Sequence, residues 1–77
     1  MIIGQAYDRL SKIIVDKEDE GVAWPWEDIQ LMVVGIFIGE IGTYPTEQEL
    51  SENLSILSSR CYAYKYLKRN KNESEIW

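Results

Sequence analysis

The stretch PTEQELSENLSILSSRCYAYKYLKR, residues 45–69, carries the local signals that decide the fold. Thr46 and Glu49 form the T-x-x-E pattern of a capping box, in which each side chain accepts a hydrogen bond from the backbone amide of the other residue. A helix is therefore expected to begin at this point. Ser58 is a second cap candidate, and the chain after it continues without proline, glycine or acid through Asn72. The stretch predicts two helices joined by about three or four residues, which is a helix-turn-helix.

These residues resemble the bihelical core of helix-turn-helix transcriptional regulators and of replication-initiator N-terminal domains. The positions that carry the resemblance are Pro45, Thr46, Glu49, Leu50, Leu54, Ile56 and Cys61. Three positions depart from the family pattern, because Ser51 replaces the common alanine, Ser55 replaces the turn glycine and Leu57 replaces a polar cap. The resemblance implies a DNA-binding core over about residues 46–70, with a recognition helix over about residues 58–70.

The recognition helix would meet DNA with two sets of side chains. Outward-facing residues near its start would contact base edges, and these are Ser59, Arg60, Tyr62 and Ala63. Cations further along would contact phosphates, and these are Lys65, Lys68, Arg69 and Lys71. A simpler interpretation is also open, since cations suit the C-terminal end of any helix and tyrosines are more often packing residues than base-stacking ones. Only seven residues follow Asn70, too few for a two-stranded wing.

The N-terminal segment has the period of an amphipathic helix. Apolar or long side chains recur at steps of three and four residues, at Ile3, Ala6, Tyr7, Leu10, Ile13, Ile14 and Lys17. The helix is expected to end near the acidic run of residues 16–20, with Gly21 as its stop, and this run is interpreted as a solvated turn.

A second helix is expected to begin near Trp26, because Pro25 suits a first turn and Glu27 and Asp28 suit the positive end of the helix dipole. Its body is apolar on two sides. One stripe contains Ile29, Met32, Val33, Ile36 and Phe37, and the other contains Leu31, Val34, Ile38 and Ile41. Such a helix is expected to be surrounded by others. A buried strand is the rival interpretation, but the chain offers no second strand to pair with it.

Composition limits the classes of function. Seventy-seven residues allow a single helical domain over residues 1–77, and the expected architecture is an all-α compact bundle of about four helices with no wing. The chain has no histidine and one cysteine, Cys61, so neither a disulfide within the chain nor a metal site is expected. No cofactor is implied. The low cysteine content fits a cytoplasmic protein. The apolar run of residues 31–42 is too short to cross a membrane. An enzyme is not expected, because no base accompanies the thiol.

Charge is distributed unevenly along the chain. Residues 1–52 carry a net charge of −8, residues 53–72 a net charge of +5, and the last five residues −2. A basic helix on an acidic body would draw DNA to one end. The first hypothesis is thus a small transcriptional regulator of phage or mobile-element type that binds double-stranded DNA.

The alternative hypothesis is a small acidic modulator or inhibitor, also of phage type, that uses the bundle as a scaffold to bind a host or regulatory protein. Its candidate protein contacts are Trp24, Trp26 and Trp77. A third option is a structural subunit that oligomerises, and a homodimer is a candidate assembly in each case because the chain is so short.

Overall fold

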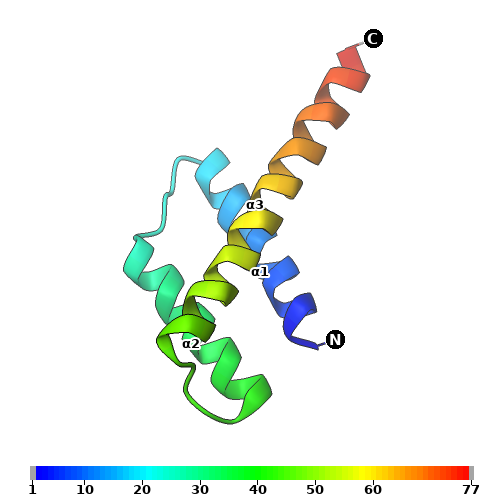
Figure 1. Ribbon diagram of the computed structural model, residues 1–77. Helices are drawn as coiled ribbons and strands as arrows, with labels where there is room; N and C mark the ends of the chain where they lie inside the picture. The colour runs from blue at the N-terminus through cyan, green and yellow to red at the C-terminus, as the bar shows by residue number, and fades with distance from the viewer. Residues whose placement is uncertain (1, 77) are drawn as a thin grey trace.

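The computed structural model describes the backbone of residues 2–76 and the side chains of residues 4–69. It contains three helices, α1 (Ile2–Asp19), α2 (Trp26–Ile41) and α3 (Glu47–Ile76), and no strand within the described backbone (Figure 1). The all-α prediction is confirmed, and α2 is a helix as expected. The prediction of about four helices is wrong, because the region expected to hold two helices holds one.

α1 and α3 run in the same direction and cross, whereas α2 runs back the other way (Figure 1). The direction follows from their contacts, since Tyr7 meets Asn53 and Asp16 meets Tyr64, at nearly equal sequence separations of 46 and 48 residues. The C-terminal part of α3 extends away from the other two helices (Figure 1), and the whole chain measures 49 × 26 × 18 Å.

α3 is one continuous helix of 30 residues, so the turn expected after Leu54 is wrong. The physical reason is an apolar stripe that keeps its phase through this region. Its members recur at steps of four and three residues, at Leu50, Leu54, Leu57, Cys61 and Tyr64. A straight helix can hold all of them on one side, and no glycine or proline interrupts residues 47–76. Ser55 therefore stays helical where a turn would have required a left-handed residue.

The start of α3 is the predicted capping box. The Thr46 amide donates to Glu49 Oε1 at 3.0 Å, and the Glu49 amide donates to Thr46 Oγ1 at 3.2 Å. Both donors would otherwise lack a partner within the helix. This confirms the expected start.

The ends of the other helices also follow their local signals. α2 begins directly after Pro25, with Glu27 and Asp28 in its first turn, as predicted. It ends at Gly42, whose φ of 96° places it in the left-handed region and lets its amide donate to the Ile38 carbonyl at 2.9 Å. Gly21, the second residue after the end of α1, has a φ of 88°.

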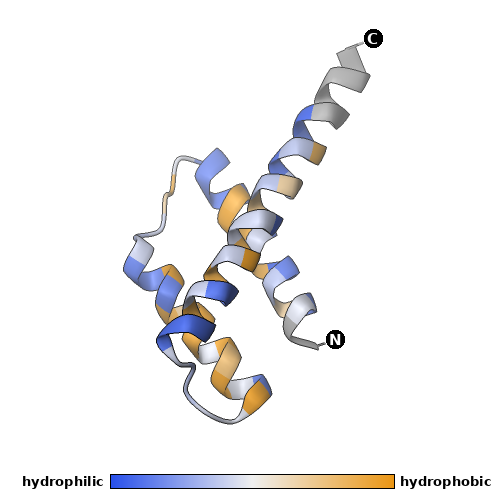
Figure 2. Cartoon of the chain, viewed as in Figure 1, coloured by the Kyte–Doolittle hydropathy of each residue, from blue (hydrophilic) through white to orange (hydrophobic). Residues whose placement is uncertain are grey.

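The hydrophobic core lies where the three helices meet. It consists of Tyr7, Leu10, Ile14, Val33, Phe37 and Leu57. Two buried polar groups at its border are satisfied, because the Ser11 hydroxyl donates to the Asp8 carbonyl at 2.6 Å and the Tyr7 hydroxyl donates to Asn53 Oδ1 at 2.8 Å. Hydrophobic residues are concentrated in α2, whereas α3 is largely polar (Figure 2).

Candidate interaction surfaces

The cations of α3 face the acidic C-terminal turns of α1. Lys68 Nζ lies 2.8 Å from Asp16 Oδ1 and 2.5 Å from Asp19 Oδ2. Lys65 Nζ lies 3.0 Å from Glu18 Oε2. Asp16, Glu18 and Asp19 are thus paired with α3, although the acidic run stays exposed to solvent as expected. The expectation that this run forms a turn is corrected, because α1 continues through Asp19.

Charge pairing shifts the protonation equilibria of these groups. The Lys68 ammonium, which donates to Asp16, lowers the pKa of that carboxyl, and a hydrogen bond from the Tyr64 hydroxyl at 3.1 Å acts in the same direction. The hydrogen bonds to Asp16 and Asp19 raise the pKa of Lys68. The hydrogen bond to Glu18 raises the pKa of Lys65. Phosphates at these lysines would have to compete with carboxylates of the same chain.

The residues predicted to contact bases lie in the middle of α3. Ser59, Tyr62 and Ala63 are exposed there. Arg60 is half-buried, with Nη1 3.9 Å from Asp8 Oδ1. Its Nε is buried and has no hydrogen-bond partner among the described residues. The guanidinium is thus held against α1.

The residues predicted to contact phosphates are divided. Lys65 and Lys68 are paired with α1, as described above. Arg69 is exposed and forms no ion pair with any described residue. The Lys71 side chain lies outside the described residues.

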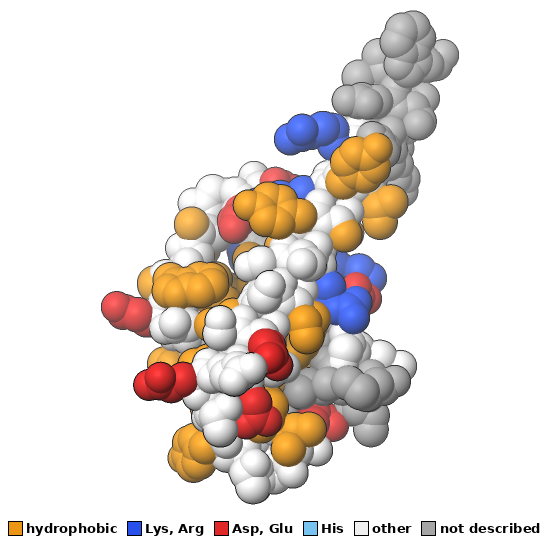
Figure 3. Space-filling model, in the orientation of Figure 1, with side chains coloured by type: hydrophobic (Ala, Val, Ile, Leu, Met, Phe, Trp, Pro, Cys, Tyr) orange, Lys and Arg blue, Asp and Glu red, His pale blue; other side chains and the backbone are white. Residues whose placement is uncertain are grey.

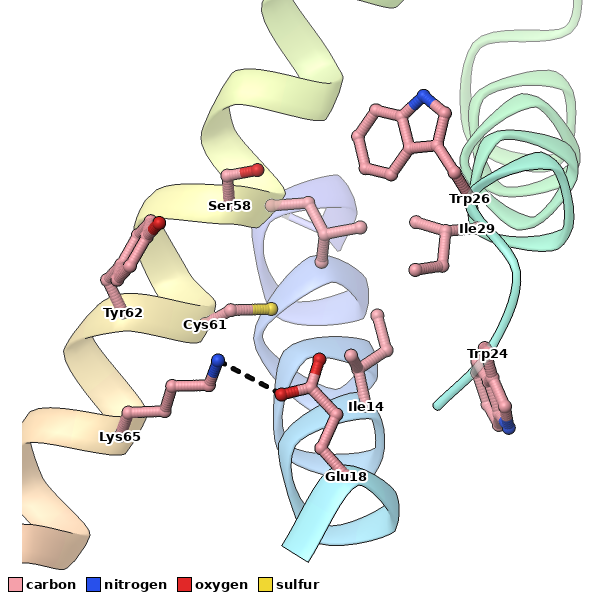
Figure 4. A pocket seen from close by; sticks show the side chains of 10 residues that line it. Ile14, Glu18, Trp24, Trp26, Ile29, Ser58, Cys61, Tyr62 and Lys65 are labelled. Atoms are coloured by element: carbon pink, nitrogen blue, oxygen red, sulfur yellow. Dashed lines mark ion pairs between the residues drawn. The ribbon is translucent and has the colours of Figure 1, made fainter. Parts of the chain in front are cut away.

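Two of the three predicted protein-contact residues line one hollow, which we call the Trp26 hollow (Figure 4). Trp24 comes from the α1–α2 connection and Trp26 from the start of α2. Cys61 points toward them from α3, and Tyr62 lines the edge of the hollow. The hollow has a volume of about 300 Å³, and the Lys65–Glu18 pair borders it. Trp77, the third predicted contact, lies outside the described residues.

The Trp26 hollow includes the one cysteine of the chain, Cys61. Burial raises the pKa of the Cys61 thiol, and the nearby Glu18 carboxylate acts in the same direction. The thiol form is therefore favoured at neutral pH, and the lining of the hollow is mixed, with apolar side chains beside Glu18, Ser58 and Lys65.

The second apolar stripe of α2 is only partly covered by the described structure, and we call it the α2 outer stripe: Leu31, Val34, Ile38 and Ile41. Leu31 and Ile41, at its two ends, are exposed, and Val34 and Ile38 between them are half-buried. Leu31 is 69% exposed and Ile41 is 55% exposed, whereas Val33 on the inner side is fully buried. The expectation that α2 is surrounded by other helices is wrong for this side. The stripe is visible in the sequence, where its pattern predicts that other helices cover it.

The segment of the chain that contains the α2 outer stripe carries charge of one sign. Residues 18–59 contain nine Asp or Glu and no Lys or Arg. The acids of α2 itself are Glu27, Asp28 and Glu40, all exposed. On the face shown in Figure 3, acidic side chains prevail at the left and in the lower part, and basic ones lie at the middle right and at the upper end. The stripe thus lies on a helix whose charged side chains are all acidic.

Comparisons of the chain with protein-family models, with curated proteins and with solved structures found no match. Within the described part of the chain, none of the helices combines the length and the apolar character that crossing a membrane requires. The same residues contain no cluster of three or more potential metal ligands.

Proposed function

We propose that this chain is a small protein-binding module, and that the α2 outer stripe packs against an amphipathic helix of a partner protein. The observation that carries this proposal is the exposure of Leu31 and Ile41 on a helix whose opposite side forms the core. Contiguous apolar side chains of this kind on a surface typically mark an interaction site.

The spacing of the stripe suits a helical partner. Its four members follow one another at steps of three, four and three residues, which is the pattern of a seam between two helices. Gly35 lies next to the α2 outer stripe, and a Cβ built on it would meet nothing within 4 Å. A partner backbone can therefore approach α2 closely at this point.

Charge determines the chemistry of the partner. The stripe is flanked by Glu27, Asp28 and Glu40, with no cation anywhere from residue 18 to residue 59. Lys and Arg beside the partner's apolar seam would complement this field, whereas acids there would be repelled. The partner is therefore a basic amphipathic helix, which matches a modulator that binds a nucleic-acid-handling or regulatory protein.

The DNA-binding regulator is the competing function. It is supported by the exposed Arg69 and by the basic end of α3, and it is weakened by the ion pairs of Lys65 and Lys68 and by the absence of a turn within α3. DNA binding is therefore included in the test.

The test uses defined probes and a matched pair of variants. A synthetic helix with a leucine seam flanked by lysines, the same helix with glutamates, and a DNA duplex are titrated separately against the protein by calorimetry. We expect the lysine peptide to bind and Leu31→Gln to weaken binding about tenfold, or ~1.4 kcal/mol. Leu67→Gln is the control, because Leu67 is 64% exposed on α3 and lies outside the stripe.

Two results would overturn the proposal. One is a lysine peptide that does not bind, or that binds Leu31→Gln as tightly as the unaltered protein. The other is salt-sensitive retention on the duplex that Arg69→Ala weakens, without peptide binding, which would favour the regulator.

A further inference from the structure

α3 carries a second row of residues that its own chain leaves largely uncovered. We call it the α3 seam, and its members are Glu47, Ser51, Ser55, Ser58, Tyr62, Lys65 and Arg69. They follow one another at steps of three or four residues over the helix, so they share one face. Ser58 is half-buried and the other six are exposed.

Charge along the α3 seam changes sign from one end to the other. Glu47 lies at its start, Arg69 lies at its end, and Ser58 stands eleven residues from each. Two such helices placed side by side in the same direction would bring like charges together. Placed in opposite directions around Ser58, they would bring each Glu47 to the other copy's Arg69.

The α3 seam also offers both a protruding side chain and a hollow to receive it. Tyr62 is 74% exposed, and it lies four residues after Ser58. Four residues before Ser58 is Leu54, in a hollow whose lining also includes Trp26, Gln30, Leu50, Ser51 and Ser55. An antiparallel arrangement centred on Ser58 brings Tyr62 of each copy opposite Leu54 and Ser55 of the other.

We propose that two copies of this chain form a symmetric dimer in which the α3 seams pack antiparallel about a two-fold axis at Ser58. A two-fold contact requires one patch to complement itself, and this seam does so in charge and in shape. Three serines at and before the centre allow the helices to approach closely. The described end of α3 extends beyond α1 and α2 (Figure 1), so it is free to reach the second copy.

The dimer is independent of the proposed partner site. The α3 seam and the α2 outer stripe share no residue, and the two α2 residues of the hollow that would receive Tyr62, Trp26 and Gln30, are not members of the stripe. Leu31→Gln is therefore expected to leave the dimer intact, and Tyr62→Ala is expected to leave binding of the lysine peptide intact. Failure of one proposal can be distinguished from failure of the other.

Sedimentation equilibrium on the full chain tests the dimer. We expect Tyr62→Ala to weaken association at least tenfold, and Tyr44→Ala to leave it unchanged, because Tyr44 is 78% exposed outside the seam. Glu47→Arg and Arg69→Glu are each expected to weaken association, and the double variant is expected to restore it. Loss of helix stability at Glu47 alone would not be repaired by a change at Arg69.

Cross-linking tests the position of the two-fold axis. In a Cys61→Ala background, checked for folding by circular dichroism, Ser58→Cys is expected to form a disulfide-linked dimer under mild oxidation, and Ser59→Cys is not. The proposal is overturned if the protein is a monomer at every concentration, if Ser59→Cys cross-links as readily as Ser58→Cys, or if Leu31→Gln and not Tyr62→Ala dissociates the dimer.

Discussion

Lys68 Nζ lies 2.8 Å from Asp16 Oδ1 and joins the last turns of α1 to α3 beyond the hydrophobic core. Tyr64 adds a hydrogen bond to the same carboxylate oxygen, and Asp19 holds the same ammonium. The pair fixes the position at which α3 leaves the body of the molecule. It also links the stability of the fold to pH.

The first prediction concerns how the free energy of unfolding depends on pH in the acidic range. The pKa of Asp16 is lowered in the folded protein from its ordinary value of 3.8, so this group stabilises the fold above that pH and the stabilisation is lost as pH falls through the folded pKa. We expect the urea midpoint to fall between about pH 4 and pH 2, and to fall less in Asp16→Asn. Chemical denaturation followed by circular dichroism at each pH is the measurement.

Glu40→Gln provides the control for this experiment, because Glu40 is exposed and has no ion pair with a described residue. Glu40→Gln should leave the fall of the urea midpoint between about pH 4 and pH 2 unchanged. At alkaline pH the dependence has the opposite sign, because the pKa of Lys68 is raised above its ordinary value of 10.5 in the folded protein. The contribution of Lys68 to the free energy of unfolding is therefore fully present below that pH. It is lost as pH rises through the folded pKa. If the urea midpoint of Asp16→Asn falls at low pH as much as that of the unaltered protein, the Asp16–Lys68 pair adds no stability.

The second prediction distinguishes one continuous α3 from two helices joined by a turn. Ser55 is exposed in the helix interior, where alanine is favoured over glycine by about 1 kcal/mol. Ser55→Ala should therefore raise the free energy of unfolding and Ser55→Gly should lower it. At a left-handed turn position the order would be reversed, because glycine enters that conformation without strain. Urea denaturation of the two variants gives the order directly.

The local signals of the sequence predicted the helix starts but not the continuity of α3. Thr46 with Glu49 and Pro25 with Trp26 act over a few residues, and both starts are where the pattern placed them. Ser58 resembles a cap when it is considered alone, yet serine is tolerated within a helix. The deciding signal is the unbroken phase of Leu50, Leu54, Leu57, Cys61 and Tyr64, which only a count across the supposed turn reveals.

The interaction surfaces were less accessible to sequence reasoning. Lys68 and Asp16 are 52 residues apart, so local patterns do not show that the basic face of α3 is paired with α1. The α2 outer stripe was visible as a period, but a period does not say whether its own chain or another covers it. Whether the stripe is covered depends on how many helices pack around α2. Because residues 47–76 form one helix instead of two, α1 and α3 cover only one side of α2.

The third prediction compares two leucines of the same helix. Leu57 is 2% exposed within the core cluster, and Leu67 is 64% exposed on the extended part of α3. Leu57→Ala should cost about 2–5 kcal/mol of unfolding free energy, because it removes buried surface and leaves a cavity. Leu67→Ala should change it by less than about 0.5 kcal/mol. Equal losses at both positions, measured by urea denaturation, would place Leu67 in a buried contact.

The fourth prediction concerns the hydrogen bond between Tyr7 and Asn53, which lies at the border of the core and joins α1 to α3 at 2.8 Å. Tyr7→Phe should cost about 1 kcal/mol, since the half-buried Asn53 oxygen loses its donor. Asn53→Ala should cost more, because the Asn53 amide also donates to the Glu49 carbonyl at 2.6 Å. In a double-mutant cycle the two changes should be non-additive by about 0.5–1.5 kcal/mol. Strict additivity would mean that the two groups do not interact in solution, and that the alignment of α1 with α3 depends on the leucines and the ion pairs alone.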